Sequence, residues 1–228
     1  MKEIERLFES LRTEGRTSRI GELEISVVDG DFVLYHRDDV GRNDLTLYEL
    51  DHAFEIAKFD DAGDYRSLKT APNLRHGWKI FARDVSQLEQ VIDAIYPGRL
   101  AVMHAFKLGQ LAVTPLRETL NRQSGMYRIA RKISDPELDA LVGNFCRSDG
   151  GCLRTILWKR DTGEKVASSK LPPEKFDPAT DQYLGAQKPR PATAATVSFP
   201  LLCQEACNLL VAACREKVKM EGTTPSAP

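Results

Sequence analysis

The sequence predicts an α+β protein in two parts, a mixed α/β support domain followed by a small cysteine-bearing domain. Helical and strand-like patterns of apolar residues alternate through the first half of the chain. This pattern changes near residue 125, and every cysteine lies beyond that point, between residues 146 and 214. Every histidine lies between residues 36 and 104. The segregation of cysteine from histidine indicates two parts with different chemistry.

The first elements are predicted to be a helix followed by a β-hairpin. Apolar residues at helical spacing predict an amphipathic helix over residues 2–14, which Gly15 ends. Residues 22–28 and 32–37 are rich in β-forming side chains. The Asp-Gly-Asp break at residues 29–31 is typical of a hairpin turn.

Shorter elements with recognisable start and stop signals follow up to residue 125. Potential caps, apolar stripes and turn residues identify them. The expected elements are a helix capped by Asp44, a loop over residues 60–73, a strand over 77–82, a helix capped by Ser86 and stopped by Tyr96-Pro97-Gly98, and a helix starting at Thr114-Pro115.

The remainder of the chain is predicted to form a compact domain interrupted by a long loop. A capping-box order at residues 134–137 starts a helix with Cys146 at its end. The other expected elements are strands over 126–133 and 153–158, an irregular stretch over 159–198, and a final helix over 202–220. The expected domains are therefore 1–125 for support, 126–220 for the cysteine site, and a disordered tail over 221–228.

The composition is that of an ordinary globular protein. The chain has 228 residues with 32 basic and 33 acidic side chains, a formal net charge of −1. This balance gives no electrostatic case for binding nucleic acid or an anionic membrane. The N-terminus lacks the apolar stretch of a signal peptide, so we expect a cytoplasmic protein. Cytoplasmic thiols stay reduced, which makes clustered cysteines metal ligands or catalysts rather than disulfides.

Two close pairs of cysteines predict a metal site. Cys146 and Cys152 flank a short polar loop with two glycines, which lets the backbone wrap closely. Cys203 and Cys207 are placed at i and i+4 of the predicted last helix, on one face and near its positive end. Four soft thiolates suit a cuboidal iron–sulfur cluster or zinc.

Two alternatives to an iron–sulfur cluster remain open from the residues. Cysteines are often simply buried, and we interpret the fifth, Cys214, as a small hydrophobic side chain of the core. Zinc is the other alternative, although its structural sites usually have ligand pairs two to four residues apart, often with histidine. The second interpretation gives a zinc-stabilised interaction module without catalysis. No nucleotide-binding loop, catalytic triad or dinucleotide fingerprint is present.

The blocks around these cysteines resemble a known family. The stretch RQSGMYRIARKISDPELDALVGNFC, the following LW and FPLLCQEAC are similar to the C-terminal half of long bacterial sirohydrochlorin and cobalt chelatases. In those proteins a stabilising domain, which GWKIFARDVSQLEQVIDAIYPG resembles, precedes a [4Fe–4S] domain. The resemblance covers nearly the whole chain. It implies that Cys146, Cys152, Cys203 and Cys207 bind the cluster, in a role that is structural, redox-active or regulatory.

The histidines favour an accessory role over a catalytic one. Metal insertion needs a base and a metal ligand, and the resemblance implies that family chelatases carry such histidines in N-terminal domains absent from this chain. His36, His52, His76 and His104 are far apart in sequence, so we expect no pairing among them. His52 with Glu55 is the one couple with helical spacing, and we expect a surface pair. The expected partners are a separate catalytic chelatase chain or a tetrapyrrole.

Overall fold

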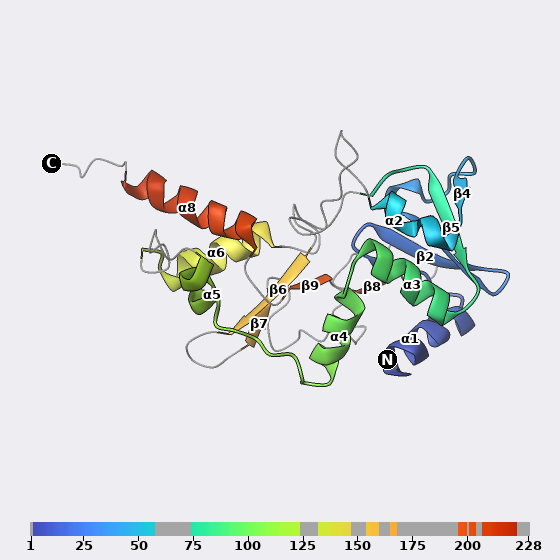
Figure 1. Cartoon of the computed structure of the whole chain (residues 1–228), viewed down its shortest axis with the longest axis horizontal. Coiled ribbons are helices and arrows are strands. Elements are labelled where there is room, and N and C mark those ends of the chain that lie inside the picture. The colour runs from blue at the N-terminus through green and yellow to red at the C-terminus, as the bar shows by residue number, and fades with distance from the viewer. Residues whose placement is uncertain are drawn as a thin grey trace. The chain divides into compact units, whose positions relative to one another are not determined.

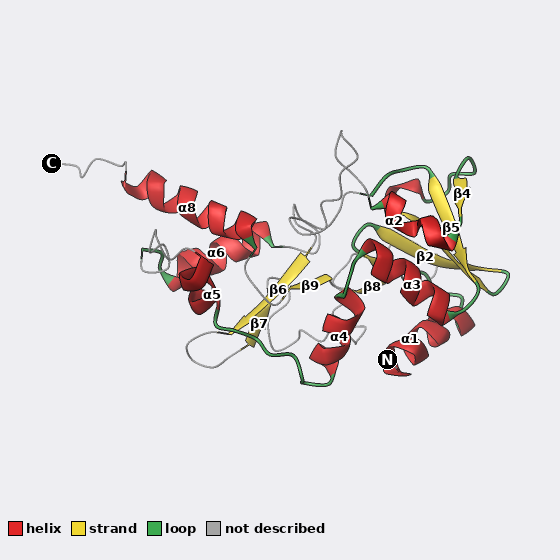
Figure 2. Ribbon diagram, in the orientation of Figure 1, coloured by secondary structure: helices red, strands yellow, loops and turns green. Residues whose placement is uncertain are grey.

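The computed structural model describes most of the chain as two compact units (Figures 1 and 2). The described residues are 2–57, 74–123, 132–146, 154–159, 165–167, 196–199, 201–203 and 207–222. The first unit consists of Met1–Leu111 and Asp177–Leu201, and the second consists of Ala112–Phe176 and Leu202–Pro228. The chain is a mixture of helices and strands, as the predicted α+β class requires. The domain bounds drawn from the sequence stay a prediction.

The described strands of the first unit form a six-stranded sheet with the order β4-β5-β3-β2-β1-β8. The four inner strands β5, β3, β2 and β1 pair antiparallel with one another in that order. At the edges, β4 lies parallel to β5 and β8 lies parallel to β1. Both edges of the sheet are therefore parallel pairings with a strand from elsewhere in the sequence. The strands are β1 (Ser18–Ile20), β2 (Leu23–Val28), β3 (Asp31–His36), β4 (Thr46–Tyr48), β5 (Trp78–Ala82) and β8 (Val197–Phe199).

The predicted hairpin is confirmed by β2 and β3. Their register pairs Leu23 with His36, so His36 ends the second strand. The turn residues Asp29 and Gly30 have φ values of +52° and +88°. Positive φ at both central positions is the turn geometry that matches the twist of the flanking strands, and aspartate and glycine tolerate it. The local sequence is therefore enough to specify this pair.

Helices α1 (Lys2–Thr13) and α3 (Val85–Ile95) pack against each other and add to the core of this unit (Figure 1). Both agree with the helices predicted from apolar spacing. The cap of α3 differs from the prediction, because Asp84 rather than Ser86 holds that position. The Asp84 carboxylate accepts a hydrogen bond from the Gln87 N–H at 2.8 Å. The buried side chains of the two helices are Ile4, Phe8, Leu11, Val85, Leu88, Val91, Ile92 and Ile95.

The helix predicted after Asp44 begins later and is shorter than expected. Asp44 does not cap a helix, because its carboxylate accepts two hydrogen bonds from the Arg42 guanidinium, at 2.9 and 2.7 Å. The Thr46 N–H donates to the Gly77 carbonyl, which starts β4 beside β5. Pairing with a neighbouring strand thus overrides the local helical pattern. The observed elements are β4, η2 (Leu50–His52) and the short helix α2 (Ala53–Ile56).

A buried carboxylate fixes the segment that follows β3. Asp39 ends the turn η1 (Arg37–Asp39) and is only 3% exposed. It accepts hydrogen bonds from the Gly77 N–H at 2.6 Å and from the Arg42 guanidinium at 2.8 Å. Burial opposes ionisation, but these hydrogen bonds and the charges of Arg42 and His76 together lower the pKa of Asp39. The charged carboxylate therefore joins η1 to the start of β5.

Strand β8 completes the sheet from far along the chain. The Val197 N–H donates to the Thr17 carbonyl at 2.9 Å beside β1. Val197 and Phe199 are buried, and the Phe199 ring lies 5.5 Å from that of Phe8 between centroids. This strand corrects the irregular stretch predicted over residues 159–198. The sequence signal was weak because β8 is three residues long and its partner is distant.

The remaining helices and strands lie in the C-terminal half, apart from α4 (Arg99–Lys107). The predicted capping box is confirmed, since the Glu137 carboxylate accepts from the N–H and the hydroxyl of Ser134, at 2.8 and 2.6 Å. The final helix begins later than predicted and extends through residues 221 and 222, which the sequence placed in the tail. The elements are α5 (Leu116–Gln123), α6 (Asp135–Phe145), β6 (Arg154–Lys159), β7 (Lys165–Ala167), β9 (Leu201–Cys203) and α8 (Asn208–Gly222).

Several predicted features lie outside the described residues. They include the loop over 60–73, most of the strand over 126–133, the loop that carries Cys152, and the last residues of the tail. Strand β7 falls within the predicted irregular stretch and is a further correction to it. In the part of the chain that the structure describes, no helix has the length and apolar character needed to cross a bilayer.

Candidate metal centre

Three of the four cysteines expected to bind a metal lie at the ends of elements. Cys146 is the residue that ends α6. Cys203 is the last residue of β9. Cys207 lies directly before α8, and its carbonyl accepts from the Val211 N–H at 3.0 Å. Cys152 lies outside the described residues.

These three cysteines share one hydrophobic cluster. Cys146 is buried within it, and Cys203 and Cys207 are partly buried against it. The fold thereby brings the end of α6 and the segment before α8 to the same core, which a shared metal site requires. The assignment of individual cysteines as ligands stays a prediction. The buried members of the cluster are Leu116, Leu120, Ile133, Leu138, Val142, Cys146, Ile156, Leu210, Val211 and Cys214.

Cys203 and Cys207 do not lie on one helix face, which corrects the prediction. Leu201 and Leu202 are 1% and 0% exposed in β9, so sheet burial rather than helical periodicity places Cys203. Cys207 instead occupies the N-terminal cap position of α8. The positive end of the helix dipole lies at Cys207, where it favours an anionic ligand group. The chain therefore presents one thiol from a strand end and one from a helix start.

Cys214 has an environment that suits a core residue. It lies in α8 with no exposed surface and is a member of the same hydrophobic cluster. Burial raises the pKa of Cys214 to about 11. This agrees with the interpretation of Cys214 as a small hydrophobic side chain.

The donor chemistry fits a cuboidal iron–sulfur cluster. Such a cluster takes four cysteine thiolates, and the three described cysteines with Cys152 supply that number. Four cysteine thiolates also form structural zinc sites.

Comparison with known families now identifies both parts of the chain. Residues 108–216 match the family described as a 4Fe-4S iron-sulfur cluster binding domain. This part is an iron–sulfur domain. Residues 4–107 match the family described as the DR2241 stabilising domain. The chain thus has a stabilising domain followed by a [4Fe–4S] domain, the order that the resemblance implies, and the match to the [4Fe–4S] family favours the cluster over zinc.

A solved structure has a similar fold over most of the chain. The crystal structure of DR2241 from Deinococcus radiodurans matches with a TM-score of 0.59 at 24% sequence identity. The match covers 93% of this chain and 40% of the DR2241 chain, so the present chain spans less than half of that protein's length. DR2241 is described as a multi-domain protein with structural similarity to chelatases and two additional novel domains. No curated protein matches the chain.

The stabilising domain contains a histidine pair that sequence reasoning missed. His36 and His76 were expected to be unpaired, but their ring centroids lie 3.9 Å apart. Because β3 and β5 are antiparallel neighbours, the end of one lies beside the start of the other. That strand pairing is the signal that could have revealed the pair. His52 is half exposed, and its Nδ1 lies 3.8 Å from a carboxylate oxygen of Asp51.

Proposed function

We propose that this chain is the iron–sulfur part of a system that inserts metal ions into tetrapyrroles of the sirohydrochlorin and cobalamin pathways. The observation that carries the proposal is the order of its two domains, a stabilising domain followed by a [4Fe–4S] domain. The same fold forms part of DR2241, whose description includes structural similarity to chelatases. In this proposal the metal-inserting chemistry belongs to a chelatase-type unit outside these 228 residues.

Four cysteines hold the cluster in this proposal. They are Cys146, Cys152, Cys203 and Cys207. When bound, the cluster supplies a one-electron redox centre and ties the loop after α6 to the segment before α8. The dipole of α8 and the surrounding apolar cluster tune that centre, because reduction potential depends on local charge, hydrogen bonding and exposure. The role is structural, redox-active or regulatory.

The proposed partner is a separate chelatase chain or the tetrapyrrole itself. The near-zero net charge gives no support for nucleic acid or an anionic membrane as a partner. A cytoplasmic location fits four reduced thiolates, since thiols persist there in the reduced state.

Cluster content is the first test. Protein purified without oxygen is expected to be brown, with about four irons and about four sulfides per chain. Electron paramagnetic resonance of the reduced protein identifies the cluster type. A colourless protein that contains zinc and lacks sulfide would overturn the proposal in favour of the zinc-stabilised module.

Metal insertion is the second test. We expect the chain alone, with its cluster intact, to insert cobalt into sirohydrochlorin no faster than the uncatalysed reaction. Insertion needs a base for the pyrrole protons and a metal ligand beside it, and the proposal assigns both to the other unit. Adding a chelatase catalytic chain should restore turnover, and removal of the cluster should change its rate. The absorbance change of sirohydrochlorin on cobalt insertion measures the turnover of the chain alone and the rate with the catalytic chain.

Two results of that assay would contradict the accessory role. Turnover by the chain alone, lost in a His52→Ala variant, would make the chain the enzyme. If a catalytic chain does not bind this protein and inserts metal at the same rate with or without it, the link to chelation is removed.

A further inference from the structure

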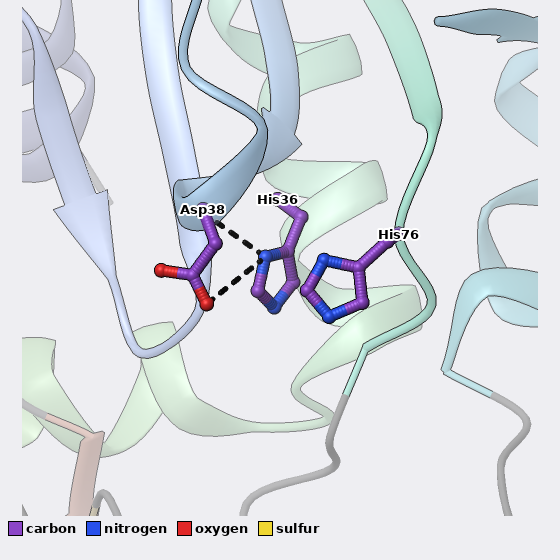
Figure 3. A group of neighbouring side chains, drawn as sticks. All are labelled: His36, Asp38 and His76. Carbon is purple, nitrogen blue, oxygen red and sulfur yellow. Dashed lines mark hydrogen bonds and ion pairs between the residues drawn. The ribbon is translucent and has the colours of Figure 1, made fainter. Parts of the chain in front are cut away.

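Three side chains of the stabilising domain meet beside the end of β3 (Figure 3). His36 is the last residue of β3, Asp38 lies in η1, and His76 lies just before β5. One ligand atom from each side chain lies within 4.8 Å of the other two. Within the described residues, this is the one group of three histidine, cysteine or acidic side chains with such spacing.

The group combines one fixed side chain with two adjustable ones. His36 is 2% exposed, whereas Asp38 and His76 are 64% and 58% exposed. The three ligand atoms now lie within 4.8 Å of one another. An ion that binds each of them at about 2.0–2.2 Å needs these atoms closer together than that. Rotation of the two exposed side chains can close that gap without moving the core. Their exposure also gives an ion a direct path to the site.

The surroundings of His36 indicate which of its two nitrogens carries the lone pair. Its Nδ1 accepts from the Asp38 N–H at 3.1 Å and lies 3.8 Å from an Asp38 carboxylate oxygen. An accepting Nδ1 carries the one lone pair of the neutral ring, so Nε2 carries the hydrogen, and an ion bound at Nδ1 would take the place of the Asp38 N–H as its partner. That Nε2 lies 3.8 Å from the Glu22 carboxylate. A carboxylate behind the second nitrogen is the usual support of a metal-binding histidine.

His76 has a similar carboxylate neighbour. Its Nδ1 lies 3.7 Å from Asp39 Oδ1, and Asp39 is buried and held by the Gly77 N–H and by Arg42. The site therefore has two imidazoles, one carboxylate that can bind directly, and two further carboxylates behind the rings. Two guanidinium groups offset part of this negative charge, because Arg42 pairs with Asp39 and Asp44, and the Arg37 Nε lies 3.8 Å from an Asp38 carboxylate oxygen. The four carboxylates of Glu22, Asp38, Asp39 and Asp44 outnumber these two cations.

We propose that His36, Asp38 and His76 form a binding site for one divalent transition-metal ion in the stabilising domain. Two imidazole nitrogens and one carboxylate oxygen suit borderline ions such as Zn²⁺ or Co²⁺ rather than Mg²⁺ or Ca²⁺, which prefer oxygen ligands alone. Three protein ligands leave a coordination position open, as in sites that exchange or activate a ligand. The inference uses none of the cysteines and does not depend on the proposed role in chelation.

The test is a zinc titration of the full chain with its iron–sulfur cluster intact, under anaerobic conditions. Keeping the cluster bound removes its thiolates as competitors for zinc. Calorimetry and elemental analysis should find one zinc per chain in addition to iron. His76→Ala and Asp38→Asn should each weaken zinc binding by about tenfold or more. His52→Ala is the matched control, because it removes another half-exposed histidine with an acidic neighbour, and its affinity should be unchanged.

X-ray absorption at the zinc edge identifies the ligands directly. The expected spectrum has nitrogen and oxygen neighbours with imidazole outer shells and no sulfur. Three results would overturn the proposal, namely no saturable binding, equal affinity in wild type and His76→Ala, or zinc bound through sulfur. Since the measurements report only zinc, they leave the chelation proposal untouched whichever way they fall.

Discussion

Cys203 and Cys214 place the same side chain in two different environments around one apolar cluster. Cys203 is partly exposed at a strand end, while Cys214 is fully buried with a raised pKa. We therefore expect Cys203→Ala to lose most of the iron, from about four per chain to near none. Cys214→Ala should keep its iron, because Cys214 packs inside the hydrophobic cluster and is not among the four proposed ligands. Iron and sulfide analysis of both variants is the measurement.

The two variants control each other. Both variants remove one sulfur atom that packs in or against the same hydrophobic cluster, so a general loss of packing would lower the iron content of both. Loss of iron in Cys214→Ala with retention in Cys203→Ala would show that the ligand set is wrong.

At the residue scale, sequence reasoning found the cysteines but not the polar contacts of the stabilising domain. The cysteine pairs are recognisable because each pair is close in sequence. Asp39 and His76 acquire their roles only when the turn after β3 meets the start of β5. No local pattern distinguishes a buried Asp39 from the exposed Asp38 next to it. Such roles depend on strand pairing, which single-residue properties do not encode.

Helix α3 provides a test at the scale of one element. Asp84 caps it through the Gln87 N–H, whereas Ser86 lies within its first turn and is exposed. Asp84→Ala should lower the free energy of unfolding by about 0.5–2 kcal/mol. Ser86→Ala should be neutral or slightly stabilising, since alanine has the better helix propensity. Urea unfolding curves of the two variants measure this difference.

The opposite ranking would contradict the observed cap. A larger loss in Ser86→Ala than in Asp84→Ala would mean that the helix begins two residues later in solution, as the sequence pattern suggested.

Elements that rest on local signals were predictable, and those that rest on distant partners were not. The hairpin, α1, α3 and α6 have clear periodicity, turn residues or caps within their own sequence. Strands β4, β8 and β9 are each three residues long and exist because a neighbouring strand pairs with them. Burial of Leu201 and Leu202 in a sheet moved Cys203 off the predicted helix. The metal site could therefore be predicted in composition but not in local geometry.

At the scale of the whole molecule, β8 does not follow the division of the chain into two family matches. It lies within residues 108–216, which match the cluster family, yet it pairs with β1 in the sheet of the first unit. Phe199 anchors it against Phe8. The stabilising sheet is therefore incomplete without a segment from the second half of the chain.

Phe199→Ala should destabilise that sheet by about 3–5 kcal/mol, the usual cost of removing a buried phenylalanine ring. Amide hydrogen exchange should show the loss at Ser18–Ile20, where β8 pairs. Phe81→Ala is the control, because that ring is 38% exposed and its removal should cost about 1 kcal/mol or less. Unchanged protection of Ser18–Ile20 in Phe199→Ala would show that β8 does not support β1.

The pairing of β1 with β8 also sets the order of events during translation. The hydroxyls of Thr17 and Thr196, which hydrogen-bond at 2.7 Å, are 179 residues apart. A ribosome that adds about 5–20 residues per second needs roughly 10–35 seconds to make that stretch. Throughout this interval the nascent chain exposes an unpaired strand edge, the kind of surface that chaperones protect from aggregation. Cys203 and Cys207 follow β8 in the chain, so the last two of the four proposed cluster ligands leave the ribosome only after the strand that covers that edge.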